Sequence, residues 1–463
     1  MPHVSLLRHG SANFRTVSPL IRKSSTFFLG VMLATTCGQA QQSPSGIDPE
    51  IAATIASIKA FDNHAHPVLP PPSDKSDRNF DALPVDQMEP QTDPIGLRPD
   101  DPRLRDAWRA LWHFEAASLP LDAAAQKQLE SARAVVKSRE GLRFSTWMLD
   151  QSNIATMVAN RTSLGLGIAE PRFRWVPYDD ALLFPLDTTG IAVTPDKKQF
   201  YPLEDRLRAQ YLAAVNLKAQ PTTLPEYLAK VVTPTLERQK TGGAIAVKFE
   251  IAYLRGFDFA DPSLPEAENI YAKLQGKPRP DRVDYKLLQD FLFRYVAREC
   301  GRLGLAVHVH TMAGAGSYFS IAGANAMLLE PIFNDPTLRK TNFVMLHGGW
   351  PFVREAGSLL QKPNVYLDIS QQSMIIPART LAGWLREWLE TYPDKVLFAT
   401  DGYPYSDALG WEEATWIASR NARQALGLAL TGMVQDGEIS RPRAAEIAAM
   451  VLHGNANALY GKP

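Results

Sequence analysis

The stretch NFVMLHGGWPFVREAGSLLQKPNVYLDIS, residues 342–370, carries the pattern that decides the fold. Its two short apolar runs, at 342–347 and 364–370, have the length and composition of buried β-strands. Residues 351–361 between them have the pattern of a helix. A buried strand, a helix and a second buried strand predict a parallel βαβ unit.

This alternation recurs along the chain. Six further runs are of the buried-strand type, and they lie at 60–66, 154–159, 172–179, 244–252, 305–311 and 395–401. The other helical patterns lie at 285–303, 317–334 and 377–392, with two closing helices at 410–431 and 441–460. Eight strands alternating with helices predict an α/β fold, a (β/α)₈ TIM-type barrel.

Two segments exceed what a barrel needs, although we expect residues 41–463 to form a single domain. Residues 67–100 are rich in Pro and Asp and predict a long irregular excursion, which continues as a helical stretch to about residue 150. The insertion at about 180–240 is longer than one barrel helix. We expect it to form a lid over the site.

The N-terminus has the pattern of a secretory signal peptide. Arg22 and Lys23 precede an apolar run of about 11 residues, and small residues follow as far as Ala40. Cleavage near Ala40 would make the protein secreted or periplasmic. A lipoprotein signal through Cys37 and a leader that stays attached are the weaker alternatives. Cys300 would then be the remaining cysteine, and its helical surroundings predict a buried side chain without a disulfide.

Charge and motifs exclude several functions. The 49 Lys and Arg balance 49 Asp and Glu, whereas a nucleic-acid-binding protein usually has a basic excess. The sequence contains no dinucleotide fingerprint after a strand, no P-loop and no nucleophile elbow. Outside the leader, no stretch is long enough to span a membrane. We therefore expect a small-molecule substrate as the partner, and no signal indicates an oligomer.

Five of the nine histidines follow predicted strands. They are His64, His66, His308, His310 and His347. The active site of a barrel lies at the C-terminal ends of its strands. Two residues apart on a strand, the members of each His-x-His pair point to the same face, and neutral imidazoles suit Zn²⁺. Asp401 ends the apolar run KVLFATD and could bind a metal and act as general base, or instead cap the next helix.

Together these motifs resemble the amidohydrolase superfamily, particularly its amidohydrolase-related family with a single-metal barrel site. The resemblance covers roughly residues 60–463. It rests on DNHAHP (62–67), VHVHT (307–311), LHGGWP (346–351), NVYLDIS (364–370), FATDG (398–402) and HGNANALYG (453–461).

The resemblance implies a role for each of these residues. The implied metal ligands are His64, His66, His310 and Asp401, with His308 as a substitute for His310 or a residue lining the pocket. His347 would contact the metal-bound water or the substrate carbonyl. Asp401 would also be the base.

Lys248 lies on the predicted fourth strand, where burying an unpaired ammonium is costly. Three interpretations stay open: a carboxylated lysine bridging two metals, a cation for the substrate or the metal-bound water, and an ion pair with Glu250. The segment also resembles the amidohydrolase branch fused to glutamine-synthetase-like domains. Tyr253, Arg255 and Trp350 are the expected substrate contacts.

The expected function is therefore a metal-dependent hydrolase acting on an amide, lactone or related bond of a small molecule. One Zn²⁺ per chain is expected, or two if Lys248 is carboxylated. A non-oxidative decarboxylase of a small carboxylate is the first alternative. A non-catalytic ligand-binding barrel is the second.

Overall fold

All eight predicted strands are present in the computed structural model, which describes residues 46–84, 88–89 and 92–461. The strands are β1 (Ala60–Ala65), β2 (Ile154–Asn160), β3 (Phe173–Val176), β4 (Ala246–Phe249), β5 (Ala306–His310), β6 (Phe343–Leu346), β7 (Val365–Asp368) and β8 (Val396–Leu397). The proposed signal peptide, with Cys37, lies outside the described residues.

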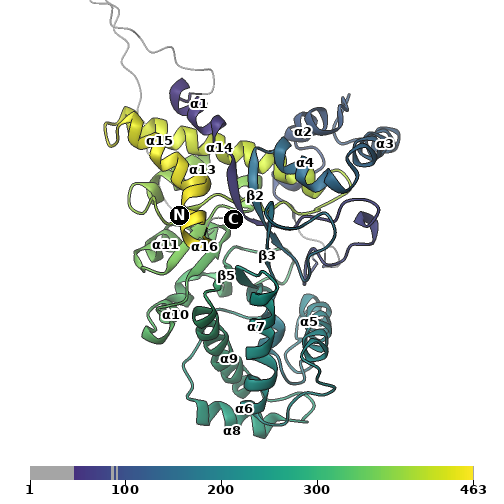
Figure 1. The fold of residues 1–463 in the computed structure, drawn as a ribbon, viewed down its shortest axis with the longest axis vertical. Coiled ribbons are helices and arrows are strands. Elements are labelled where there is room, and N and C mark those ends of the chain that lie inside the picture. Colours follow the sequence, from purple (N-terminus) through teal and green to yellow (C-terminus); the bar gives the residue numbers. More distant parts are fainter. Residues whose placement is uncertain (1–45, 85–87, 90–91, 462–463) are drawn as a thin grey trace, which may run out of the picture. The chain divides into compact units, whose positions relative to one another are not determined.

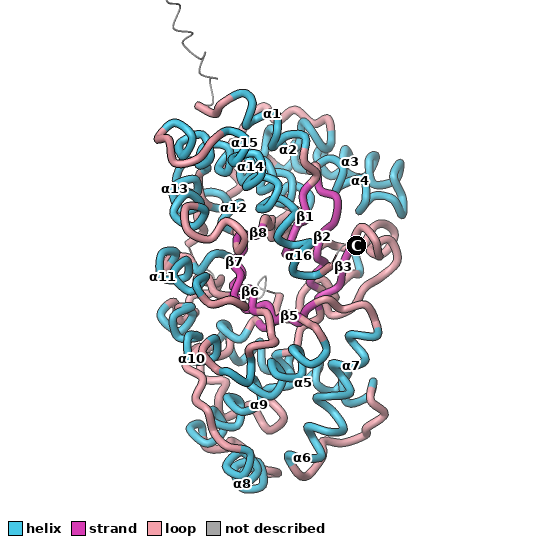
Figure 2. Tube along the Cα trace, turned by 60° about the vertical axis from the view of Figure 1, so that its left-hand side comes forward, coloured by secondary structure: helices cyan, strands magenta, loops and turns pink. Residues whose placement is uncertain are grey.

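The strands are parallel and follow chain order, in one sheet of β1-β2-β3 and another from β4 to β8. Backbone hydrogen bonds cross both gaps between the sheets. Lys248 N–H donates to Pro177 O between β4 and β3, and Asn63 N–H donates to Phe398 O between β1 and the end of β8. In Figure 2 the strands accordingly surround a common centre. The predicted α/β barrel architecture is confirmed.

The helices follow the strands and cover the outside of this ring (Figure 1). They are α1 (Pro49–Ser57), α2 (Arg103–Trp112), α3 (Ala123–Glu140), α4 (Phe144–Gln151), α5 (Pro195–Ala214), α6 (Leu224–Tyr227), α7 (Thr233–Thr241), α8 (Leu264–Leu274), α9 (Arg282–Leu303), α10 (Glu330–Phe333), α11 (Val353–Ser358), α12 (Gln372–Ile375), α13 (Ala378–Leu389), α14 (Trp411–Gln435), α15 (Arg441–Ala449) and α16 (Asn455–Tyr460).

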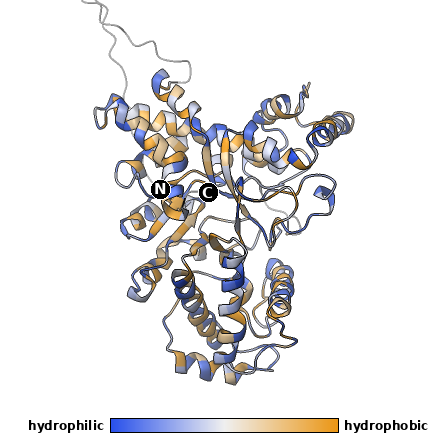
Figure 3. Ribbon diagram, viewed as in Figure 1, coloured by the Kyte–Doolittle hydropathy of each residue, from blue (hydrophilic) through white to orange (hydrophobic). Residues whose placement is uncertain are grey.

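Local chemistry sets the ends of these helices. The Asp281 side chain accepts hydrogen bonds from two free backbone N–H groups at the start of α9, and Gly304 ends that helix at φ 64°. Hydrophobic and hydrophilic residues alternate along the helices (Figure 3), because one face of each packs on the core. Cys300 on α9 is fully buried and free, as predicted.

The short helix α16 closes the ring of strands at their N-terminal ends. Its Ala456, Leu459 and Tyr460 pack in one cluster with residues early in the strands, such as Phe61 and Ala306. In Figure 2, α16 accordingly lies among the strands. The opposite, C-terminal end of the ring is therefore the end that remains open to a ligand.

Two predictions about the connecting segments were wrong. Residues 317–334 do not form one helix but two 3₁₀ turns and α10, because Asn325 leaves the helical conformation and its side chain caps the next turn. Residues 180–240, expected as a lid, form α5, α6 and α7, of which α6 packs with α8 and α7 with α9. No described residue of that segment lines the cavity described below.

Among the described helices, none combines the length and the apolar character that crossing a membrane requires.

Candidate metal site

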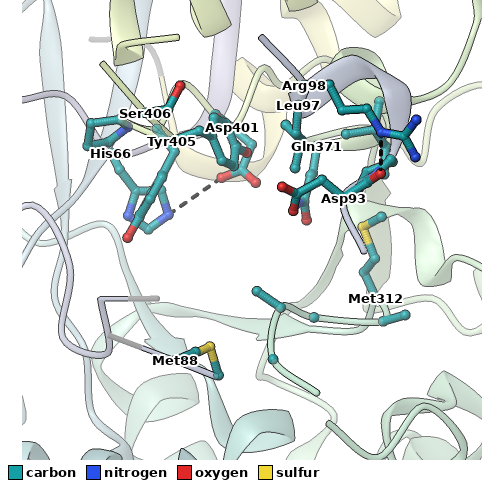
Figure 4. Close-up of a pocket in the computed structure, with 18 of the residues that line it drawn as sticks. His66, Met88, Asp93, Leu97, Arg98, Met312, Gln371, Asp401, Tyr405 and Ser406 are labelled. Atoms are coloured by element: carbon teal, nitrogen blue, oxygen red, sulfur yellow. Dashed lines mark hydrogen bonds and ion pairs between the residues drawn. The ribbon is translucent and has the colours of Figure 1, made fainter. Parts of the chain in front are cut away.

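A cavity of about 1230 Å³ opens at the C-terminal ends of the strands. Its floor includes His64, His66, His310, His347 and Asp401. Its wall comes from the long excursion, including residues between Asp81 and Gln126, and from the loops after β5 and β8. Figure 4 shows His66 and Asp401 facing this cavity, with Met88 and Asp93 from the excursion around it. The excursion, not the segment 180–240, therefore walls the site.

Three potential ligand atoms form a nearly regular triangle on the cavity floor. Asp401 Oδ1 lies 3.2 Å from His64 Nε2 and 3.5 Å from His66 Nε2, and the two nitrogens are 3.3 Å apart. Tetrahedral ligands at the usual Zn–N distance are separated by about 3.3 Å. The donor set and its spacing therefore fit one zinc ion.

The tautomer of His66 suits this role. Its Nδ1 lies 2.9 Å from the carbonyl oxygen of Phe80 and 3.0 Å from the hydroxyl of Tyr178. Because the carbonyl can only accept, whereas the hydroxyl can donate or accept, we assign the proton to Nδ1. Nε2 then holds the lone pair and faces Asp401 and His64. A backbone carbonyl that fixes the tautomer in this way is the usual support for a metal-binding histidine.

His347 also belongs to this group. His64, His347 and Asp401 each offer an atom within 4.8 Å of the others. His347 Nδ1 is 3.8 Å from Asp401 Oδ2, whereas His64 and His66 approach Oδ1. His347 thus lies beside the candidate metal position, where a water or a substrate carbonyl would be.

His310 is in the cavity but outside that group. Its ring lies 4.5 Å from the ring of His347, and its Nε2 donates to Met312 O at 3.0 Å. Nδ1 is therefore the atom left to serve as a ligand. The four expected ligands are brought to one cavity, but His310 does not belong to the group of His64, His347 and Asp401 whose atoms lie within 4.8 Å of one another.

Burial shifts the acid–base behaviour of the group. Desolvation lowers the pKa of His66 to about 4 and that of His64 well below its usual value, so both rings are neutral at pH 7. Desolvation raises the pKa of Asp401 to about 8 when no metal is bound. Neutral imidazoles next to a carboxylate that a cation would ionise are the donors zinc requires.

Lys248 reaches the same group from β4. It is almost fully buried, and its Nζ lies 3.4 Å from His64 Nε2 and 3.9 Å from Glu250 Oε1. The contact with Glu250 is long for an ion pair, and the other Glu250 oxygen has no hydrogen-bond partner among the described residues. The ammonium therefore lies within reach of the metal position rather than being fully neutralised by Glu250.

Two predicted site residues lie elsewhere. Arg255 does not line the cavity, because its guanidinium is 2.6 Å from Asp290 Oδ1 and stacks on Phe259. His308 lies deeper in the barrel, where its Nε2 is 2.7 Å from the hydroxyl of Tyr460. Tyr253 and Trp350, the other expected substrate contacts, do line the cavity.

Sequence reasoning missed the residues that hold His347. Ser370 Oγ lies 2.8 Å from His347 Nδ1 and donates to Asp368 Oδ1 at 2.5 Å, and the same oxygen accepts the backbone N–H of His347 at 2.9 Å. Asp368 ends an apolar strand just as Asp401 does. This position at the end of an apolar strand was the sequence signal that could have identified Asp368.

The backbone is strained at three strand ends around the site. His347, Gln371 and Asp401 have positive φ angles of 65°, 54° and 57°. Residues other than glycine rarely adopt positive φ angles, and the residues that do so cluster at functional sites. The strain aims His347 and Asp401 into the cavity, which Gln371 also lines.

Comparison with known proteins agrees with this architecture. Residues 259–462 match the amidohydrolase family model. Protein fluG of Emericella nidulans is 29% identical over 228 residues, 47% of this chain, and the match spans only a quarter of that protein's length.

Solved structures give the same fold. A protein of Lactobacillus casei provisionally designated a metal-dependent hydrolase aligns with a TM-score of 0.59 at 16% identity, over 89% of this chain and 97% of its own. Glucuronate isomerase of Caulobacter crescentus aligns with a TM-score of 0.57 at 14% identity, over 91% and 96%. The match of residues 259–462 to the family model supports the resemblance to the amidohydrolases, and the solved structures show the same fold.

Proposed function

We propose that this protein is a metal-dependent hydrolase of the amidohydrolase superfamily that cleaves an amide, lactone or related bond of a small molecule. The observation that carries the proposal is the triangle of His64 Nε2, His66 Nε2 and Asp401 Oδ1, whose sides match the ligand spacing of tetrahedral zinc. The floor of a cavity is where such an ion would meet a substrate.

The ion would lower the pKa of a bound water toward 7 and polarise the scissile carbonyl. Asp401 would accept the proton of that water. Its Oδ1 faces His64 and His66, whereas its Oδ2 faces His347 and is left for the proton. The same carboxyl would return the proton to the leaving amine or alkoxide.

His347 would stabilise the oxyanion. Ser370 donates its proton to Asp368, so it accepts one from His347 Nδ1. His347 Nε2 is then free of that proton, and the ring would help either as a ligand through Nε2 or, once protonated, as a donor to developing negative charge. Tyr253 and Trp350 would bound the substrate.

A decarboxylase is the second candidate, and the position of Lys248 is what favours it. A buried ammonium 3.4 Å from a ligand histidine could hold a substrate carboxylate next to the metal. The same ammonium could instead be carboxylated and hold a second ion. A non-catalytic barrel is disfavoured, because such a protein has no need of the strained backbone at His347 and Asp401.

Metal content per chain is the measurement that tests this proposal. Protein purified without added metal or chelator should contain about one zinc by elemental mass spectrometry, and a His64→Ala/His66→Ala variant should contain none. Close to two zinc ions would support a carboxylated Lys248. Absence of metal even after incubation with zinc would refute the proposal.

With metal established, amide and lactone substrates should be screened beside small carboxylates. Release of CO₂ from a carboxylate, without turnover of any amide or lactone, would favour the decarboxylase.

A further inference from the structure

A continuous chain of hydrogen bonds runs through the barrel interior from His347 to the C-terminal helix α16. Its links join His347 Nδ1 to Ser370 Oγ at 2.8 Å, Ser370 Oγ to Asp368 Oδ1 at 2.5 Å, Asp368 Oδ2 to Asn63 Nδ2 at 2.7 Å, Asn63 Oδ1 to Tyr460 Oη at 2.6 Å, and Tyr460 Oη to His308 Nε2 at 2.7 Å. The candidate metal site and the closed end of the barrel are thus connected.

Each proton in this chain has one consistent position. Asp368 can only accept when ionised, so Ser370 and the Asn63 amide both donate to it. The Asn63 carbonyl oxygen must then face Tyr460, which donates its hydroxyl proton. Tyr460 in turn accepts from His308. The donors point toward Asp368 from both ends, and the chain therefore fixes how each member is oriented.

Tyr460 itself is held firmly in place. Its ring stacks on Phe61 at 5.9 Å with an interplanar angle of 18°, and α16 packs against β1 and β8. The hydroxyl reaches from the closed end of the barrel to Asn63, next to the first ligand histidine in the sequence. This placement requires α16, which the site otherwise does not contact.

We propose that Tyr460 is a positioning residue for His347, acting through Asn63, Asp368 and Ser370. The proposal rests on the function proposed above for the role of His347, but the geometry of His347 can be tested without metal. Without the Tyr460 hydroxyl, the Asn63 carbonyl oxygen loses its donor, and only the hydrogen bond to Asp368 holds the amide. A less constrained amide would weaken its hydrogen bond to Asp368, the carboxylate that accepts from Ser370 and from the strained backbone N–H of His347.

The test compares Tyr460→Phe with Tyr366→Phe as the matched control. Both tyrosines pack against the same interior cluster, and the Tyr366 hydroxyl takes no part in the chain. Phenylalanine keeps the ring and removes only the hydroxyl. The readouts are the ¹⁵N chemical shifts of the His347 ring in metal-free protein, zinc affinity, the absorption spectrum of the Co²⁺-substituted protein, and the thermal unfolding midpoint.

Tyr460→Phe should convert the single Nδ1–H tautomer of His347 into a mixture and lower zinc affinity about tenfold, the lower end of effects seen for outer-shell partners. The Co²⁺ spectrum should shift. Tyr366→Phe should change none of these. Ser370→Ala breaks the last link and should have a larger effect, and Tyr460→Phe should add little in the Ser370→Ala background, because both act along one chain.

A purely structural role predicts a different result. If Tyr460→Phe lowers the unfolding midpoint but leaves the His347 tautomer, zinc affinity and Co²⁺ spectrum as in wild type, the proposal is wrong. Full additivity of the two variants would also overturn it. If wild-type protein binds no metal, the function proposed above fails, while the tautomer of His347 in metal-free protein still decides whether Tyr460 positions it.

Discussion

The two His-x-His pairs have the same spacing in the sequence but lie in different surroundings in the structure. On β1, His64 and His66 both point their Nε2 atoms at Asp401. On β5, His310 reaches the cavity, whereas His308 is engaged by Tyr460 below it. The β1 pair ends one residue beyond its strand, and the β5 pair ends on the last strand residue. Depth along the barrel axis, rather than spacing in the sequence, therefore decides which imidazoles can bind a metal.

The largest expected effect comes from removing the carboxylate of Asp401, which only the β1 pair contacts. Asp401→Asn should lower kcat by about 10²- to 10⁴-fold, since it removes the proposed general base while keeping the side-chain shape. The measurement is steady-state kinetics of zinc-loaded wild type and variant, with an amide or lactone that the substrate screen identifies.

The same variant has a pH signature. Because the pKa of Asp401 is about 8 without metal, zinc binding at pH 7 should release about one proton from it, and zinc affinity should rise with pH until about pH 8. His66, with a pKa of about 4, is already neutral at pH 7 and releases no proton when zinc binds. Calorimetry in buffers of different ionisation enthalpy should show this proton for wild type and not for Asp401→Asn. An equal release from both would exclude Asp401 as its source.

A smaller effect comes from removing one imidazole of each pair. His64→Ala should weaken zinc binding by more than about 100-fold, beyond the range for supporting residues, whereas His308→Ala should stay within about 10- to 100-fold. Competition with a chromogenic chelator measures both. Equal losses would mean that depth in the barrel does not separate the two pairs.

The smallest effect concerns stability alone. Burial lowers the pKa of His308 to about 3 from an ordinary value of 6.5, so the unfolded chain binds a proton that the folded protein does not. The free energy of unfolding should therefore decrease as pH falls from 6.5 toward 3. Urea unfolding of metal-free His308→Asn should show a shallower decrease over this window than wild type. Parallel curves would show that His308 titrates normally.

The fold was largely predictable because buried strands are apolar runs of characteristic length. All eight were found, as were α9 and α13. The segment 317–334, predicted as one helix, contains Ala, Met and Leu, whose helical preference the turn at Asn325 overrides. The lid was misplaced because length alone marks an insertion and does not say which face of the barrel it covers.

The site was predictable in its candidate ligands and in part of the cavity lining, but not in the residues that orient the ligands. Histidines and an acid after apolar strands are visible locally, whereas the residues that orient them are recognised by contacts between distant positions. Asn63 meets Asp368 across 305 positions and Tyr460 across 397. Arg255 was misassigned because its counter-ion, Asp290, lies on a different element.

The cavity draws its chemistry and its outline from separate parts of the chain. The candidate ligand and base residues sit on strand ends of the barrel, while much of the wall belongs to one contiguous excursion between β1 and β2. Exchanging that excursion between relatives would reshape what the pocket admits, and the candidate site would keep its support only if a carbonyl oxygen replaced that of Phe80, which bonds to His66. The outline of the pocket and the chemistry of its floor are thus coupled through this one contact.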